Sequence, residues 1–162
     1  MSEVSQPTPL AEDVTIIVPV RDVVVFPGAM VPIEITRQAS VLGMQECVRH
    51  ERPVGITLQL DPTTPEPNLS DLHTIGTQCR IVRYMTAPDG SHHAVVAGEQ
   101  RLRIANSVAD LPYLSAHTDA IVEPEALSDE IQAQAMYLKQ LAAETMQLRD
   151  PRYGYNLALS LN

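Results

Sequence analysis

The side chains that could carry out catalysis are few in this sequence, and their spacing fits none of the common catalytic patterns. Lys139 is the lone lysine, so a Ser-Lys protease dyad would have to use it, although it falls on the polar side of a helical pattern. No Gly-x-x-x-x-Gly-Lys-Ser/Thr loop for phosphate and no Gly-x-Ser-x-Gly or His-Glu-x-x-His motif is present. The sequence therefore predicts no catalytic residues in this segment.

The histidines and cysteines also lack the spacing of a metal site. His92 and His93 are adjacent on a predicted strand, where neighbouring side chains point to opposite faces and chelate poorly. Cys47 and Cys79 lie far apart in the sequence. We predict that both are buried free thiols, and a disulfide between them is the alternative. We expect neither a metal site nor a cofactor in this segment.

The composition and charge of the chain argue against nucleic acids and membranes as partners. The net charge is −9 and aromatic residues make up 4% of the chain, so a nucleic-acid partner is disfavoured, because phosphate binding needs a cationic surface. The start of the chain has no basic region typical of a secretory signal. The apolar run over 14–26 is too short to span a bilayer and contains Arg21 and Asp22. We predict a cytoplasmic protein that does not enter a membrane.

These residues must be positioned by a body that is mainly β with helices (α+β). Apolar alternation and β-branched residues predict strands over 14–25, 31–35, 54–60, 72–85, 92–97, 101–104 and 113–122. Pro88-Asp89-Gly90 is typical of a hairpin turn, with Gly90 at a positive φ. Apolar spacing predicts a helix over 37–51 with Thr36 as its N-cap.

The pattern divides the chain into three parts. Residues 1–13 are polar and predict a flexible tail, and 14–125 form the β-rich domain. Over 126–162 the spacing of apolar residues becomes typical of helices, with Ser128 as an N-cap. The apolar helical pattern over 155–162 stops without a cap or a polar tail, so we expect a segment of a longer protein, truncated within a helical subdomain.

Two blocks of residues resemble a known family. The first reads VPVRDVVVFPGAM over 18–30, and the second reads TIGT over 74–77, PDG over 88–90 and VAGEQRLRI over 96–104. In order and spacing they are similar to the amino-terminal domain of Lon, the ATP-dependent protease, over roughly residues 15–125, although Ala97 stands where many members carry Glu. The resemblance implies a PUA-like β pseudo-barrel with one inserted helix, followed by the start of a helical region.

The resemblance also implies a function. It implies a non-catalytic substrate-recognition domain for misfolded and regulatory proteins, which are degraded by Ser-Lys peptidase parts outside this chain. ATP and Mg would belong to that parent, and self-association into a hexameric ring is implied with it. The alternative is a stand-alone PUA-like binding module with a protein, small-molecule or RNA ligand.

Candidate contact residues fall into two groups. Apolar or edge contacts with unfolded clients are assigned to Met30, Val31, Ile33, Arg37 and Gln38. The alternative for the apolar three is a place in the core, which we favour because such residue types are most often buried. A basic patch is assigned to Arg80, Arg83, Arg101 and Arg103, and its alternative is a solvated strand face.

Overall fold

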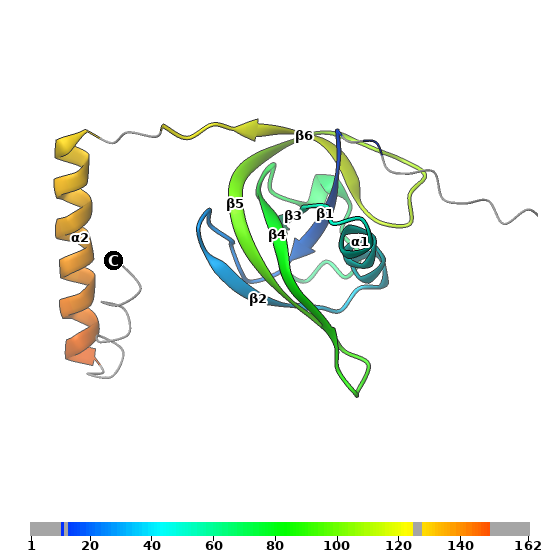
Figure 1. The fold of residues 1–162 in the computed structure, drawn as a ribbon, viewed down its shortest axis with the longest axis horizontal. Helices are drawn as coiled ribbons and strands as arrows, with labels where there is room; N and C mark the ends of the chain where they lie inside the picture. The colour runs from blue at the N-terminus through cyan, green and yellow to red at the C-terminus, as the bar shows by residue number, and fades with distance from the viewer. Residues whose placement is uncertain (1–10, 12, 125–127, 150–162) are drawn as a thin grey trace, which may run out of the picture. The chain divides into compact units, whose positions relative to one another are not determined.

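The computed structural model describes residues 11, 13–124 and 128–149, and the chain divides into two compact units, Met1–Val122 and Glu123–Asn162. The described part of the first unit contains the strands β1 (Val14–Val20), β2 (Met30–Ile35), β3 (Val54–Leu58), β4 (Ile75–Thr86), β5 (His92–Ser107) and β6 (Ser115–Ile121), with helix α1 (Gln38–Arg49) and the 3-10 turn η1 (Leu69–Asp71) (Figure 1). The described part of the second unit contains α2 (Asp129–Arg149). The predicted tail lies almost entirely outside the described residues, and the helical pattern over 155–162 lies wholly outside them.

The strands form one sheet in the order β2-β5-β4-β3-β1-β6, and an additional β5–β6 pairing closes it (Figure 1). β4 pairs with one edge of β5 from His92 to Arg103. The other edge of β5 is shared, because β2 pairs with its first half and β6 with its second half. The ring of β1, β3, β4, β5 and β6 is therefore closed, and β2 continues the sheet outside that ring.

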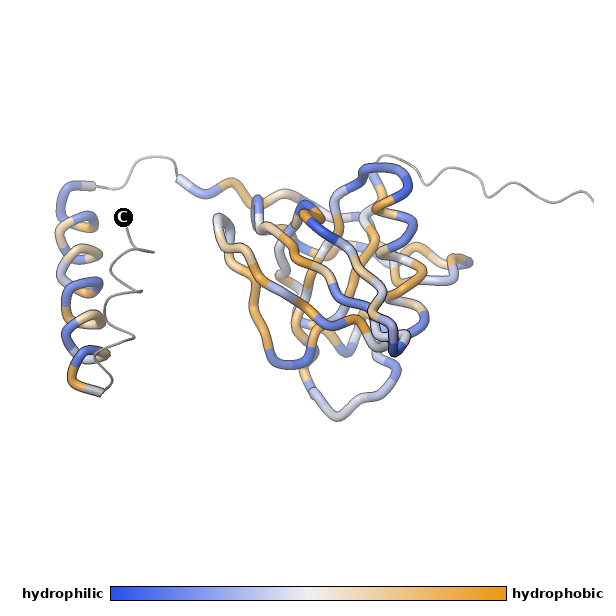
Figure 2. Tube along the Cα trace, turned by 60° about the horizontal axis from the view of Figure 1, so that its bottom comes forward, coloured by the Kyte–Doolittle hydropathy of each residue, from blue (hydrophilic) through white to orange (hydrophobic). Residues whose placement is uncertain are grey.

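The core lies inside this pseudo-barrel and beneath α1. Strand residues such as Ile16, Val54 and Val96 are buried together with Met44 and Cys47 of the helix. Figure 2 shows apolar residues along the strands of this unit, as expected when one face of each strand is buried. Aliphatic, methionine and cysteine side chains therefore supply the packing that the few aromatic residues do not.

The prediction of a mainly β protein with helices is confirmed, and so is the hairpin turn. Gly90 has φ +85°, and the Ala87 amide donates to the Ser91 carbonyl at 2.8 Å. Several boundaries were wrong, and the strands predicted separately over 92–97 and 101–104 form one continuous strand, β5. β1 ends at Val20, because the charged pair Arg21-Asp22 leaves the sheet there. Helix α1 is capped at Arg37 instead of Thr36 and has no side-chain cap.

Helix α2 begins as predicted. The Ile131 amide donates to Ser128 Oγ at 3.4 Å, and the Gln132 amide donates to the Ser128 carbonyl at 3.0 Å. Two acidic residues, Asp129 and Glu130, occupy its first turn, where they favour the helix dipole. In the part of the chain that the structure describes, no helix is long and apolar enough to cross a membrane.

Candidate binding surface

The segment over 21–29, between β1 and β2, presents apolar side chains to solvent. Val24 is 51% exposed and Phe26 is 55% exposed, while Val25 between them is buried. Successive side chains alternate here, so Val25 packs into the core and its two neighbours are left in solvent. Met30, at the start of β2, follows with 63% of its surface exposed.

This segment is held against the barrel through its backbone. The Gly28 amide donates to the Gly98 carbonyl at 2.9 Å, and the Gly98 amide donates to the Ala29 carbonyl at 2.8 Å. The buried Thr77 hydroxyl donates to the Val25 carbonyl at 2.5 Å. These bonds fix the main chain while the side chains of Val24 and Phe26 stay in solvent.

Gly98 permits this close approach. A Cβ atom at this position would lie 2.3 Å from the Phe26 carbonyl oxygen and 3.0 Å from its carbon. Any other residue would therefore push the segment away from β5. The glycine of the VAGEQRLRI block thus has a specific structural reason.

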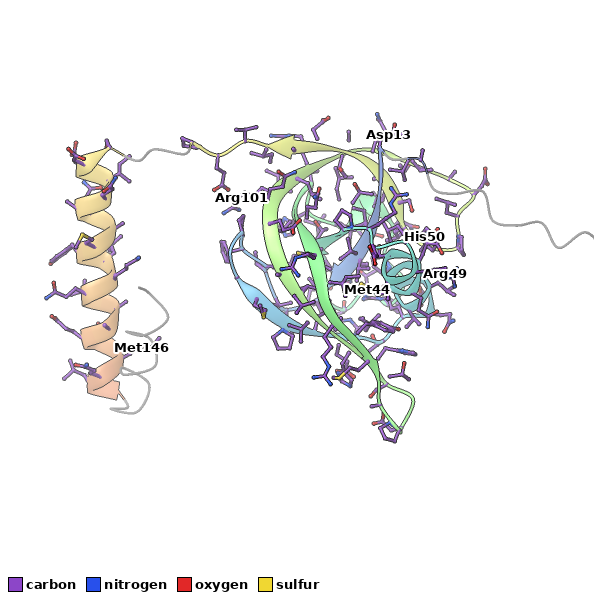
Figure 3. All side chains as sticks on the ribbon, viewed as in Figure 1. Asp13, Met44, Arg49, His50, Arg101 and Met146 are labelled. Carbon is purple, nitrogen blue, oxygen red and sulfur yellow. The ribbon has the colours of Figure 1, made fainter. Side chains whose placement is uncertain are left out.

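Arg101 and Ile75 extend the apolar surface of the segment. The Arg101 guanidinium lies over the Phe26 ring, 5.5 Å from its centroid, at a distance suited to a cation–π contact. A shallow cleft of about 350 Å³ brings Val24, Ile75 and Arg101 together. We call Val24, Phe26, Ile75 and Arg101 the loop patch. In Figure 3 Arg101 lies at the side of the barrel remote from α1.

The predicted apolar contact residues separate along β2. Met30 is exposed, Val31 is half-buried and packs against the core, and Ile33 is only 6% exposed. The prediction that Ile33 is a contact residue was wrong, because alternation along the strand turns it into the core. Sequence reasoning also missed Val24 and Phe26, which lie in the segment that begins with the charged pair after β1.

Arg37 is a structural residue and not an exposed edge, so that prediction was wrong. It is 9% exposed, and its guanidinium donates to the Pro65 carbonyl at 2.7 Å, to the Pro19 carbonyl at 3.2 Å and to Gln59 Oε1. Burial lowers the pKa of Arg37 from its ordinary value, and the charge of Arg21 lowers it further. Gln38, the next residue, is exposed as predicted.

The four arginines do not form one patch. Arg101 lies opposite Thr77 and Arg103 opposite Ile75, which puts both on one face of the β4–β5 pair. Arg80 lies opposite Ala97 and Arg83 opposite Val95, on the other face. Arg80 also forms an ion pair with Glu99 at 3.5 Å. The predicted single basic patch was therefore wrong, because bulges near Cys79 and Arg83 alter the register that simple alternation implies.

The cysteines and His92 are buried or hydrogen-bonded within the fold. Cys47 and Cys79 are buried free thiols, and burial raises the pKa of each to about 12. His92 Nδ1 lies 2.9 Å from the Tyr84 hydroxyl in the β4–β5 hairpin. Within residues 11, 13–124 and 128–149, no three His, Cys, Asp or Glu side chains are placed to hold a metal ion.

This pseudo-barrel is the fold of Lon amino-terminal domains. The N-terminal domain of a Mycobacterium avium complex Lon protease superposes with a TM-score of 0.70 at 22% identity, covering 90% of this chain and 74% of that one. A Lon N-terminal domain protein from Xanthomonas campestris gives a TM-score of 0.59 at 22% identity, covering 85% and 75%. At this level of identity the likeness establishes the fold.

Sequence comparison establishes the family. The model of the ATP-dependent protease La (LON) substrate-binding domain matches residues 14–159, and the chain belongs to this family. The Lon protease of Methylocella silvestris is 39% identical over 138 residues, which is 85% of this chain and 17% of that protein. The Lon protease of Escherichia coli K12 is 31% identical over 108 residues, covering 67% and 14%. The chain thus spans less than a fifth of the length of these relatives.

Proposed function

We propose that this chain recognises unfolded or damaged protein segments for an ATP-dependent Ser-Lys peptidase of the Lon type, which works in the cytoplasm as a ring of several copies. Its relatives are named Lon proteases, and it matches their substrate-binding domain. The peptidase and ATP–Mg sites belong, in this proposal, to parts outside the 162 residues. Within them we assign 14–125 to the recognition domain and 126–162 to the start of a helical subdomain.

The loop patch is the observation that carries the proposal. Folded proteins bury most of their large apolar side chains, whereas unfolded chains expose them, so a surface that binds apolar side chains selects for the unfolded state. Val24 and Phe26 of this patch are each more than half exposed, although the backbone beneath them is fixed by hydrogen bonds. A fixed apolar surface loses little conformational freedom on binding, which favours contact with many clients.

RNA recognition, a form of the stand-alone alternative, receives less support. The four arginines lie in two pairs on opposite faces of β4–β5, and Arg80 is already paired with Glu99. The net charge of −9 would repel a polyanion. A protein client that contacts the loop patch is more consistent with both observations.

A titration with a permanently unfolded protein tests the proposal. Reduced, carboxymethylated lactalbumin is expected to bind weakly to the chain, and native lactalbumin is expected not to bind. Phe26→Ser should weaken binding about fivefold, because it removes a large apolar contact. Val82→Ser is the control, since Val82 is also an exposed apolar residue but lies outside the loop patch.

Two outcomes would contradict the proposal. Equal binding of native and unfolded lactalbumin would show that the surface does not distinguish folding states. Loss of binding in moderate salt would indicate a charge-driven contact instead of an apolar one.

A further inference from the structure

The barrel wall is complete in one half and open in the other. In the closed half, β6 lies between β5 and β1, pairing with residues 101–107 of the first and with 14–16 of the second. In the other half, β2 takes the place beside β5, and no described strand pairs with its outer edge. The wall therefore has a gap between β2 and the last residues of β1.

The hydrogen-bond phase of β2 shows which groups face this gap. Ala29 is bonded opposite Gly98, and in an antiparallel pair bonded and non-bonded positions alternate. The next bonded positions toward β5 are therefore 31, 33 and 35, whose side chains are also half-buried or buried. Residues 30, 32 and 34 direct their backbone groups toward the gap. Pro32 falls in this outward set, so its missing amide does not weaken the ladder with β5.

A groove of about 480 Å³ lies between the free edge of β2 and the end of β1. Val18, Val20, Ile33 and Ile35 contribute its apolar lining, and Arg21, Asp22 and Glu34 contribute charged groups. On the β1 side, the Pro19 carbonyl already accepts a hydrogen bond from Arg37. The Val20 carbonyl also accepts one, from the Gln59 amide at 2.9 Å, so we assign the main-chain contacts of a ligand to β2.

We propose that this groove receives an extended segment of an unfolded client, which joins the free edge of β2 as an additional strand. The inference rests on the proposed function and assigns it a binding mode. The groups available are the amides of Met30 and Glu34 and the carbonyls of Met30, Pro32 and Glu34. Main-chain hydrogen bonds do not depend on client sequence, whereas the neighbouring loop patch selects apolar side chains. Together they suit a domain that must bind many different unfolded chains.

A second copy of this chain fits the edge less well. A symmetric antiparallel pairing centred on Pro32 would place two prolines opposite each other and lose both central hydrogen bonds. An extended client provides amide donors opposite the Pro32 carbonyl without this penalty.

Glu34→Pro tests the edge directly, because it removes an outward amide and leaves the β5 ladder intact. With reduced, carboxymethylated lactalbumin as the probe, we expect binding about fivefold weaker than wild type, corresponding to the loss of one hydrogen bond. Glu34→Gln keeps the amide and removes the charge, and is expected to bind within about twofold of wild type. Amide exchange in the wild-type chain provides an independent readout: the Met30 and Glu34 amides should slow when the probe is added.

The outcomes separate this inference from the proposed function. If the wild-type chain does not bind the probe, the proposed function fails and the edge proposal fails with it. If Phe26→Ser weakens binding but Glu34→Pro does not, only the edge proposal is overturned. If Glu34→Pro does not fold, unchanged exchange at the Met30 and Glu34 amides overturns it. A wild-type dimer that becomes monomeric in Glu34→Pro would show that a second copy occupies the edge.

Discussion

Two connecting segments of the β body are held in similar ways but present opposite surfaces. Segment 21–29 is tied down by Thr77 and by the backbone of Gly98. Segment 61–68 is tied down by the side chains of Gln59, which donates to the carbonyls of Asp61 and Thr64, and of Arg37, which donates to that of Pro65. The first exposes valine and phenylalanine, and the second exposes mainly acidic, polar and proline residues.

The comparison shows that the groups that hold each segment in place differ from the side chains that could contact a partner. In both segments buried polar groups bond the backbone, so the outward side chains are not needed to hold the loop in place. Their chemistry is then free to serve a partner, and only segment 21–29 has the apolar chemistry that unfolded clients match. Proline and acidic residues in segment 61–68 are more typical of a solvated connector.

The largest expected change in stability comes from removing the Arg37 side chain, which holds segment 61–68. Arg37→Ala leaves two carbonyls and the Gln59 side chain without their donor, and should lower the free energy of unfolding by about 3 kcal/mol. Urea denaturation measures this loss, and amide exchange should quicken over 61–68 but not over 21–29. Arg49→Ala, which removes an exposed ion pair with Glu46, is the control and should change little. An unchanged midpoint for Arg37→Ala would show that Arg37 does not support the segment.

A smaller effect is expected at the support of segment 21–29. Gly98→Ala should destabilise the protein by about 2 kcal/mol, because the new Cβ meets the Phe26 backbone. Gly90→Ala is a matched control: its Cβ would have no neighbour within 4 Å, so only its positive φ opposes alanine, at about 1 kcal/mol. Thermal unfolding of both variants gives the comparison. Equal losses would mean that the approach of Phe26 to Gly98 is not a tight contact in solution.

The smallest effect is a pH dependence confined to one segment. Asp61 Oδ1 accepts hydrogen bonds from Thr63 Oγ at 2.6 Å and from the Thr63 amide at 2.8 Å, and these hold the pKa of Asp61 below its ordinary value of 3.8. A lowered carboxyl pKa stabilises the fold above the unfolded value, and this contribution disappears as the pH falls through the folded pKa. The Thr63 amide shift in NMR should therefore titrate with a midpoint below 3.8. The Gly98 amide, bonded to a carbonyl, should not follow it, and a midpoint at or above 3.8 would contradict the account.

Local signals predicted part of this structure and long-range contacts determined the rest. The positive φ of Gly90 and the cap at Ser128 follow from neighbouring residues and were predictable. The buried position of Arg37 was not predictable, because its hydrogen-bond partners Pro19, Gln59 and Pro65 lie 18, 22 and 28 residues away in the sequence.

The arginines of β4 and β5 were misplaced for a related reason. Alternation correctly placed Arg101 and Arg103 on one face, but the face of a residue on the paired strand depends on register and bulges. A bulge leaves no reliable mark in a single sequence. The exposed Phe26 was missed because an apolar run was taken to continue as a strand, whereas β1 ends at Val20.

The most direct test of the central claim is to map amide shifts on the isotope-labelled chain as reduced, carboxymethylated lactalbumin is added. The account predicts shifts over 21–30 and at Glu34, with no change over 61–68, although hydrogen bonds hold the backbone of both segments. Shifts concentrated over 61–68 or along α1, with residues 21–30 unaffected, would contradict it.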